Sequence, residues 1–177
     1  MDKKKRLFTP LGVDHITFAV YDRHFWQRVF EGFGFVTLPT KYEAFIDHRT
    51  IVAMRHGDVR VILADPNSVN SRYASNPFVY GADIARFLTE HGDMQVFSAV
   101  IRVDDVFQAR RELWAPSILE EVNDDPFGLG VKLQLLLPFQ SSIRWELIQR
   151  LDERVFEDEE WKSRGVDHFA VGVNNLA

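Results

Sequence analysis

The segment Gly-Val-Asp-His occurs twice, and in each copy the histidine stands at the same point of a strand-like run. The first copy opens GVDHITFAV at 12–20 and contains His15; the second opens GVDHFAVGV at 165–173 and contains His168. Both runs alternate and are rich in Val, Phe, Ile and Thr, as half-buried strands are. Imidazole is a frequent metal ligand. The repeat therefore indicates a duplicated unit with a metal-ligand position on its first strand.

The first unit, residues 12–65, predicts the element order β-α-β-β-β. After a strand at 13–20, Asp22 offers an N-cap to a helix of about three turns. A short strand is expected around 35–38. Two further strands, 49–55 and 59–65, form a hairpin whose turn contains Gly57, the residue type that a positive φ favours. A short amphipathic helix, about 82–90, then leads to the second unit.

The second unit, residues 94–150, predicts the same order. Its first strand is 95–103, and Asp104 or Asp105 caps the helix that follows, with Pro116 ending it. The inner face of this helix is expected to carry Val106, Ala109, Leu113 and Trp114. The remaining strands are expected at 117–122, 131–137 and 143–149, with a long turn over 123–130.

Alternation along the strand 13–20 separates its side chains into two faces. One face carries Asp14, Ile16, Phe18 and Val20, and the other carries Val13, His15, Thr17 and Ala19. The first set is more hydrophobic and is expected to face a helix layer. The face with His15 is smaller and more polar, as a cavity lining would be.

Composition limits the classes of function. The chain has 177 residues, of which 46% are hydrophobic, and 15 are Phe, which favours sheets or an aromatic cavity over a helical bundle. A net charge of −5 argues against non-specific nucleic-acid binding. The absence of Cys excludes thiolate chemistry and favours a cytoplasmic location. No window has the length of a membrane span, so no membrane partner is expected.

The flanks are expected to lie outside the duplicated unit. Residues 1–11 predict an N-terminal tail. Residues 151–164 carry a run of acidic side chains and predict a solvated linker. Residues 165–177 then begin a further domain with the second GVDH strand, and that domain is expected to be truncated.

The tandem units resemble the vicinal oxygen chelate superfamily, and within it the N-terminal half of the 4-hydroxyphenylpyruvate dioxygenase family. The segments that carry the resemblance are 13–20 with the aromatic helix ending Gly-Phe-Gly-Phe at 32–35, the stretch 87–105, and Val-Asp-His at 166–168. The resemblance implies an α+β fold in which two βαβββ units form one open-sided, barrel-like sheet over residues 12–150.

The resemblance also implies an activity. The family converts 4-hydroxyphenylpyruvate and oxygen to homogentisate and carbon dioxide in tyrosine catabolism, with iron(II) held by two histidines and one carboxylate in its C-terminal half. His168 would be the first of these ligands, and the other two would lie beyond Ala177. A facial triad needs three ligands. This chain alone is therefore expected to bind no iron and to act as a scaffold. A 2-oxo acid substrate is expected only for the longer protein. The resemblance does not separate this substrate from that of hydroxymandelate synthase, and it leaves homo-oligomer formation open.

The first two units offer a second candidate metal site. In the superfamily, ligand positions recur on the first strand of each unit and on the last strand of the second, which would place ligands at His15 and Glu146. Aligning 20–22 with 103–105 makes Ser98 the equivalent of His15. Serine is a poor ligand for iron or zinc. The other interpretation is that His15 is a hydrogen-bonded cavity residue and that Glu146 pairs with Arg102 or Arg144.

Two other functions remain open at this point. The chain could be a stand-alone glyoxalase-like isomerase or small-ligand-binding protein that uses the cavity near His15. It could also be an interaction module, because the strand 166–173 would have unpaired edges able to extend the sheet of a partner.

Overall fold

A single mixed sheet organises the chain. The computed structural model describes residues 8–38, 51–67, 81–122, 127–136 and 143–153. The strands are β1 (Pro10–Ala19), β2 (Val36–Thr37), β3 (Val52–His56), β4 (Val59–Ala64), β5 (Gln95–Val103), β6 (Ser117–Val122), β7 (Gly128–Leu135) and β8 (Arg144–Glu153). The helices are α1 (Arg23–Gly32), α2 (Gly81–His91) and α3 (Val106–Leu113). The predicted order β-α-β-β-β is confirmed in both units.

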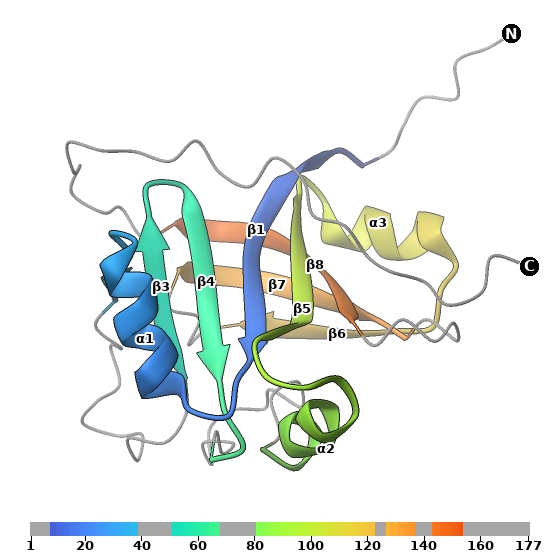
Figure 1. Cartoon of the computed structure of the whole chain (residues 1–177). Helices are drawn as coiled ribbons and strands as arrows, with labels where there is room; N and C mark the ends of the chain where they lie inside the picture. The colour runs from blue at the N-terminus through green and yellow to red at the C-terminus, as the bar shows by residue number, and fades with distance from the viewer. Residues whose placement is uncertain (1–7, 39–50, 68–80, 123–126, 137–142, 154–177) are drawn as a thin grey trace, which may run out of the picture.

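The sheet has the strand order β2-β3-β4-β1-β5-β8-β7-β6, so each unit contributes four neighbouring strands. The units meet where β1 pairs antiparallel with β5, while β1–β4 and β5–β8 are parallel pairs. Figure 1 shows β6, β7 and β8 crossing behind β1, β3 and β4 at a steep angle. The sheet therefore curls into an open-sided barrel, as expected for the predicted α+β fold.

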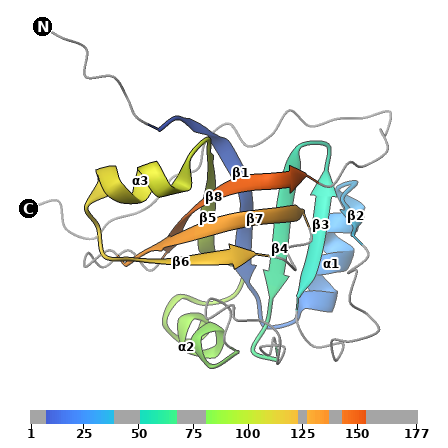
Figure 2. The same cartoon turned by 180° about the vertical axis from the view of Figure 1, so that it is seen from behind.

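The helices lie on the convex outside of this curled sheet, as the two opposite views show (Figures 1 and 2). α1 covers β3 and β4, where Val20, Met54 and Leu63 are fully buried. α3 covers β7 and β8 through Val106 and Ala109. Side chains on the inside of the curl face one another across the two crossing halves.

Helix starts and turns follow the sequence closely. The carboxylate of Asp22 accepts hydrogen bonds from the backbone N–H groups of His24 and Phe25, and Asp105 accepts one from Gln108. These two N-caps occupy equivalent positions in the repeat, which supports the alignment of 20–22 with 103–105. Gly57, in the hairpin turn, has φ 58°, the left-handed conformation that the sequence predicts there.

The structure corrects the prediction in α3 and in the bounds of several strands, among them β7, which begins at Gly128 inside the predicted turn 123–130. Leu113 and Trp114 do not lie on the inner face of α3: they are 41% and 90% exposed. The helix ends at Leu113 and Trp114 turns into the left-handed conformation, which carries its side chain away from the sheet. The terminal strands are also longer than predicted, because β1 begins at Pro10 and β8 continues to Glu153.

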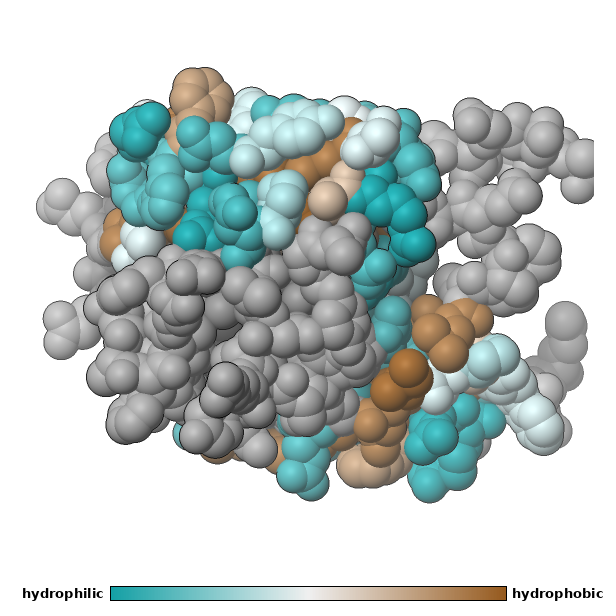
Figure 3. All heavy atoms as spheres, turned by 90° about the horizontal axis from the view of Figure 1, so that it is seen from below, coloured by the Kyte–Doolittle hydropathy of each residue, from teal (hydrophilic) through white to brown (hydrophobic). Residues whose placement is uncertain are grey.

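Exposed hydrophobic side chains are distributed over several elements. The largest exposed fractions include Phe33, Trp114 and Leu151. On the face seen from below, hydrophobic residues occur in several separate places among hydrophilic ones (Figure 3). In the part of the chain described, no helix is long and apolar enough to cross a membrane.

Gly130, on β7, is expected to tolerate no side chain. A Cβ at this position would lie 2.8 Å from the backbone oxygen of Gln149 and 3.2 Å from the side chain of Ile148. Gly130→Ala should therefore lower the free energy of unfolding by about 1–3 kcal/mol through overpacking. Gly32→Ala is the matched control: no atom of the described residues comes within 4 Å of the methyl group it would add, so it should be neutral or slightly stabilising. Urea denaturation of both variants tests this; equal stability would contradict the close approach.

Candidate functional site

A bulge in β1 brings Asp14 and His15 to the same side of the sheet. Val13 is paired with Ile101 and His15 with Val100, so Asp14 is an extra residue without a partner on β5. Both Asp14 and His15 are buried, with exposed fractions of 2% and 1%. The prediction that Asp14 faces the helix layer was wrong, because a bulge interrupts the alternation on which it depended.

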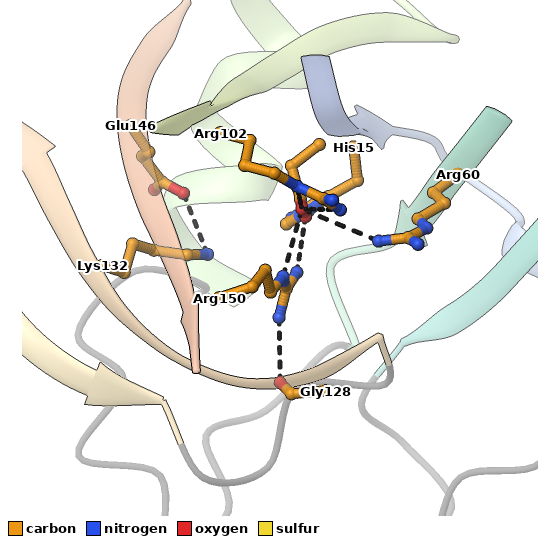
Figure 4. A network of polar contacts seen from close by, with 8 residues as sticks. His15, Arg60, Arg102, Gly128, Lys132, Glu146 and Arg150 are labelled. Atoms are coloured by element: carbon orange, nitrogen blue, oxygen red, sulfur yellow. Dashed lines mark hydrogen bonds and ion pairs between the residues drawn. The ribbon is translucent and has the colours of Figure 1, made fainter. Parts of the chain in front are cut away.

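The carboxylate of Asp14 is the centre of a polar cluster on the inner face, which we call the Asp14 cluster (Asp14, His15, Arg60, Arg102 and Arg150). Figure 4 labels the four residues that surround this carboxylate. His15 Nδ1 lies 2.7 Å from Asp14 Oδ1. Arg102 donates to Asp14 Oδ2 from Nε at 3.2 Å and Nη2 at 3.0 Å. Arg150 donates to both carboxylate oxygens, and Arg60 lies 3.7 Å away. The cluster joins β1, β4, β5 and β8.

Asp14 is ionised in this setting. Burial alone would raise the pKa of its carboxyl, but the hydrogen bonds from His15 and Arg150 outweigh burial and hold that pKa far below its usual range. Since the carboxylate only accepts, His15 Nδ1 is the donor in the bond between them. A neutral His15 then carries its lone pair on Nε2.

Glu146, on β8, forms a buried ion pair with Lys132 on β7. Lys132 Nζ lies 3.0 Å from Glu146 Oε2, and the two side chains are 7% and 3% exposed. The predicted pairing of Glu146 with Arg102 or Arg144 was wrong. Arg102 belongs to the Asp14 cluster, and Arg144 donates to Asp83 at 2.7 Å and lies over the ring of Phe97.

Ser98, on β5, is also buried on this sheet, with 4% exposed. It is paired with Thr17 on β1 and with Arg144 on β8. Its hydroxyl oxygen has no hydrogen-bond partner among the described residues.

His15, Ser98 and Glu146 do not fit an iron(II) centre. Glu146 already carries the Lys132 ammonium, and Ser98 offers a neutral hydroxyl in place of a third strong ligand. Among the residues that the structure describes, no group of three or more His, Cys, Asp or Glu side chains could hold a metal. His168, with the whole segment 165–177, lies outside the described residues, so its predicted role as an iron ligand stays a prediction.

One hydrophobic side chain completes the site. Phe127, just before β7, is fully buried on the inner face, with its ring centroid 5.3 Å from that of His15 and 5.6 Å from the Arg60 guanidinium carbon. It packs with Leu38, Ala53 and Ile62. Sequence reasoning assigned this position to a turn and missed it.

Sequence reasoning also missed Arg60, Arg150 and Lys132, and it considered Arg102 only as a partner of Glu146, although the sequence holds a signal for three of these four residues. Arg60, Arg102 and Lys132 each interrupt a largely apolar strand, in VRVIL, AVIRV and VKLQL. A charge within such a strand needs a buried partner. Their presence on three strands predicts acidic partners on the same face of the sheet.

The architecture agrees with several solved structures. Methylmalonyl-CoA epimerase of Streptomyces coelicolor, in complex with 2-nitronate-propionyl-CoA, superposes with a TM-score of 0.56 at 14% identity over 83% of this chain and 99% of its own. A hypothetical protein of Bacillus halodurans superposes with a TM-score of 0.57 at 16% identity over 85% of this chain and 100% of its own. The chain has the vicinal oxygen chelate fold. The sequence matches no family model and no curated protein.

A third vicinal oxygen chelate structure matches this chain over only half of its own length. A variant of 4-hydroxymandelate synthase from Streptomyces coelicolor superposes with a TM-score of 0.58 at 16% identity. The match covers 83% of this chain and 50% of the synthase chain. The eight-stranded sheet thus corresponds in fold to about half of that protein, whereas it corresponds to the whole of the epimerase.

Proposed function

We propose that the eight-stranded unit is the non-catalytic, structural half of a dioxygenase similar to 4-hydroxyphenylpyruvate dioxygenase. The observation that carries the proposal is the buried ion pair between Lys132 and Glu146. It supplies Glu146 with an internal cation at the point where the fold would place a metal ligand. The likeness to half of the 4-hydroxymandelate synthase chain is consistent with this division of labour.

In this proposal the chemistry belongs to the other half. His168 would be one iron ligand, and a second histidine and a carboxylate would lie outside this sequence. Iron(II), when bound there, would chelate the 2-oxo acid and activate oxygen. No chemical step is assigned to the described residues. Their role is to hold the sheet together, because Asp14 joins β1, β5 and β8 through Arg102 and Arg150.

The contacts of His15 and Glu146 favour the structural role over a stand-alone isomerase or ligand-binding function. His15 donates to Asp14, and Glu146 is paired with Lys132. The two groups best suited to acid–base or metal chemistry on the inner face are thus engaged with internal partners. Releasing Glu146 from Lys132 would leave a charge buried and uncompensated.

We expect this chain to produce no homogentisate from 4-hydroxyphenylpyruvate in the presence of iron(II), ascorbate and oxygen. It should also retain no stoichiometric iron after dialysis. An active 4-hydroxyphenylpyruvate dioxygenase in the same assay controls for the reagents and the detection of product. Homogentisate formed by this chain would overturn the proposal.

A second test of the proposal is to determine the coding sequence beyond residue 177. The proposal expects a further pair of βαβββ units, with one histidine and one glutamate on strands equivalent to the metal-bearing ones. A continuing reading frame without those two residues would contradict an iron centre there.

A further inference from the structure

The outer side of α3 exposes aromatic and basic side chains. Phe107 and Trp114 are 47% and 90% exposed. Arg110 and Arg111 lie between them and are exposed as well. Both arginines share a side of the helix with Phe107, because they follow it by three and four residues. The helix and its C-terminal end thus present two guanidinium groups between two rings, a surface that we call the α3 face (Phe107, Arg110, Arg111 and Trp114).

Trp114 has a backbone conformation that its residue type disfavours. Its φ of 51° and ψ of 16° are left-handed. Glycine usually occupies this position after a helix, because a Cβ atom makes the left-handed conformation costly. With 90% of its surface exposed, the Trp114 side chain offsets little of that cost by packing against the described residues. An exposed ring on a strained backbone indicates a binding anchor.

The charges of the α3 face favour an acidic partner. Arg111 donates to Gln108, a neutral side chain of the same helix. Glu112, the one acidic residue of α3, accepts a hydrogen bond from Gln108 as well. Gln108 and Glu112 are four residues apart and lie to one side of the α3 face. A partner that carries carboxylates beside apolar groups would therefore complement this surface.

A segment of the same chain has this composition. Residues 155–161 read VFEDEEW, so that four consecutive acidic residues stand between Phe156 and Trp161. These residues lie outside the described part of the chain. The order of ring, acidic run and ring complements the order of ring, arginine pair and ring on the α3 face. Opposite charges give such a contact its specificity, and buried aromatic groups give it affinity.

The segment begins close enough to reach α3. The helix lies on the outside of β7 and β8 (Figures 1 and 2). Its first N–H group, that of Val106, donates to Gln149 Oε1 at 3.1 Å, and β8 continues from Gln149 only to Glu153. The eleven residues 154–164 span up to about 36 Å when extended. An eight-residue helix is about 12 Å long, so the segment can reach every part of the α3 face.

We propose that residues 154–164 dock on the α3 face, with the acidic run against Arg110 and Arg111 and an aromatic side chain of the segment covering Trp114. The contact replaces the solvated linker that the charge run alone predicts. It sets the direction in which the chain continues at residue 165, whether or not the chain is half of a dioxygenase. A second copy docked face to face would bring the same two arginines together, and like charges repel.

Hydroxyl-radical footprinting of the whole chain, read at Trp114 by mass spectrometry, tests the proposal. In the wild type the segment should protect Trp114. Reversing both charges, with Arg110→Glu and Arg111→Glu, should release the segment and raise the oxidation rate of Trp114 about three- to tenfold, as expected for a tethered, weakly bound segment. Arg28→Glu with Arg86→Glu is the matched control, because it makes the same change of charge at exposed positions of α1 and α2. It should leave the rate unchanged.

An exchange of charges establishes which groups meet. Glu159→Arg with Glu160→Arg should also raise the oxidation rate of Trp114. Combining this pair with the two reversals on α3 should restore protection to within about twofold of the wild type, because opposite charges then face each other again. A purely local effect of the arginine substitutions on the ring would not be rescued in this way.

Three results would overturn the proposal. One is equal oxidation of Trp114 in the wild type and in both charge-reversed variants. Another is failure of the exchanged charges to restore protection. Protection that increases with protein concentration would also contradict it, because a second copy would then cover Trp114. Circular dichroism verifies that each variant is folded. If the double reversal on α3 does not fold, Arg110→Gln with Arg111→Gln removes the same charges, and the same expectations apply.

Discussion

Asp14→Asn is expected to be one of the most destabilising substitutions in the chain, lowering the free energy of unfolding by about 3–5 kcal/mol. The Asp14 carboxylate accepts hydrogen bonds from Arg102, Arg150 and His15 and lies 3.7 Å from Arg60. Asparagine has the same shape but no charge, and its amide nitrogen would face guanidinium donors. Urea denaturation measures the loss. Asp152→Asn, at an exposed position of β8, is the control and should change stability by less than about 0.5 kcal/mol.

The pH dependence of stability separates the loss of the Asp14 charge from a steric misfit of the asparagine side chain. The pKa of Asp14 is lowered in the folded state, so its contribution is fully present above the unfolded pKa of about 4 and is lost as pH falls toward the folded value. Below pH 4 the unfolded chain binds a proton at Asp14 that the folded chain does not. The wild type should therefore lose up to about 1.4 kcal/mol per pH unit from this residue.

In Asp14→Asn this part of the slope should disappear, while the Asp152→Asn control keeps it. Comparing the free energy of unfolding at pH 5, 4 and 3 for the three proteins is sufficient. A parallel pH dependence for Asp14→Asn and the wild type would show that Asp14 is not the ionised centre of the cluster.

Those parts of the fold that depend on local signals could be predicted from the sequence. Asp22 and Asp105 cap their helices, and Gly57 forms the turn of its hairpin. These features could be predicted because each depends on only a few neighbouring residues. The repeat of these signals in the same order, with the resemblance, was enough to predict two βαβββ units in one open sheet.

The parts of the site that depend on pairing between distant strands could not be predicted in the same way. The bulge at Asp14 results from the register between β1 and β5, which are far apart in the sequence. Trp114 was assigned to the core from its helical spacing, yet the helix ends one residue earlier. Glu146 was correctly placed on the last strand, but its partner was sought on β5 and β8, whereas Lys132 reaches it from β7.

Alternation, together with the register between β7 and β8, places Lys132 and Glu146 on one face of the sheet. Position 132 pairs with Ile148 and position 146 with Gln134, so the two charged residues are diagonal neighbours on β7 and β8. Two opposite charges in adjacent apolar strands predict a buried ion pair once the strand order is known. The limiting information was thus the register between β7 and β8.

Phe127→Ala is expected to lower the free energy of unfolding by about 3–5 kcal/mol, the range for removing a large aromatic side chain from a core. The ring is fully buried and packs with Leu38, Ala53 and Ile62, all on the inner face of the sheet. Its removal would leave a cavity between the two crossing halves. It would also remove the ring contacts to His15 and Arg60.

Phe33→Ala is the matched control, since Phe33 is 72% exposed and its truncation should have a small effect. Phe127→Leu should fall between the wild type and Phe127→Ala, because leucine refills part of the volume. Guanidinium denaturation of the four proteins gives the order directly. A loss below about 1 kcal/mol for Phe127→Ala would mean that the two crossing halves collapse onto the vacated space, because the cost of such a substitution depends on how far the site can close.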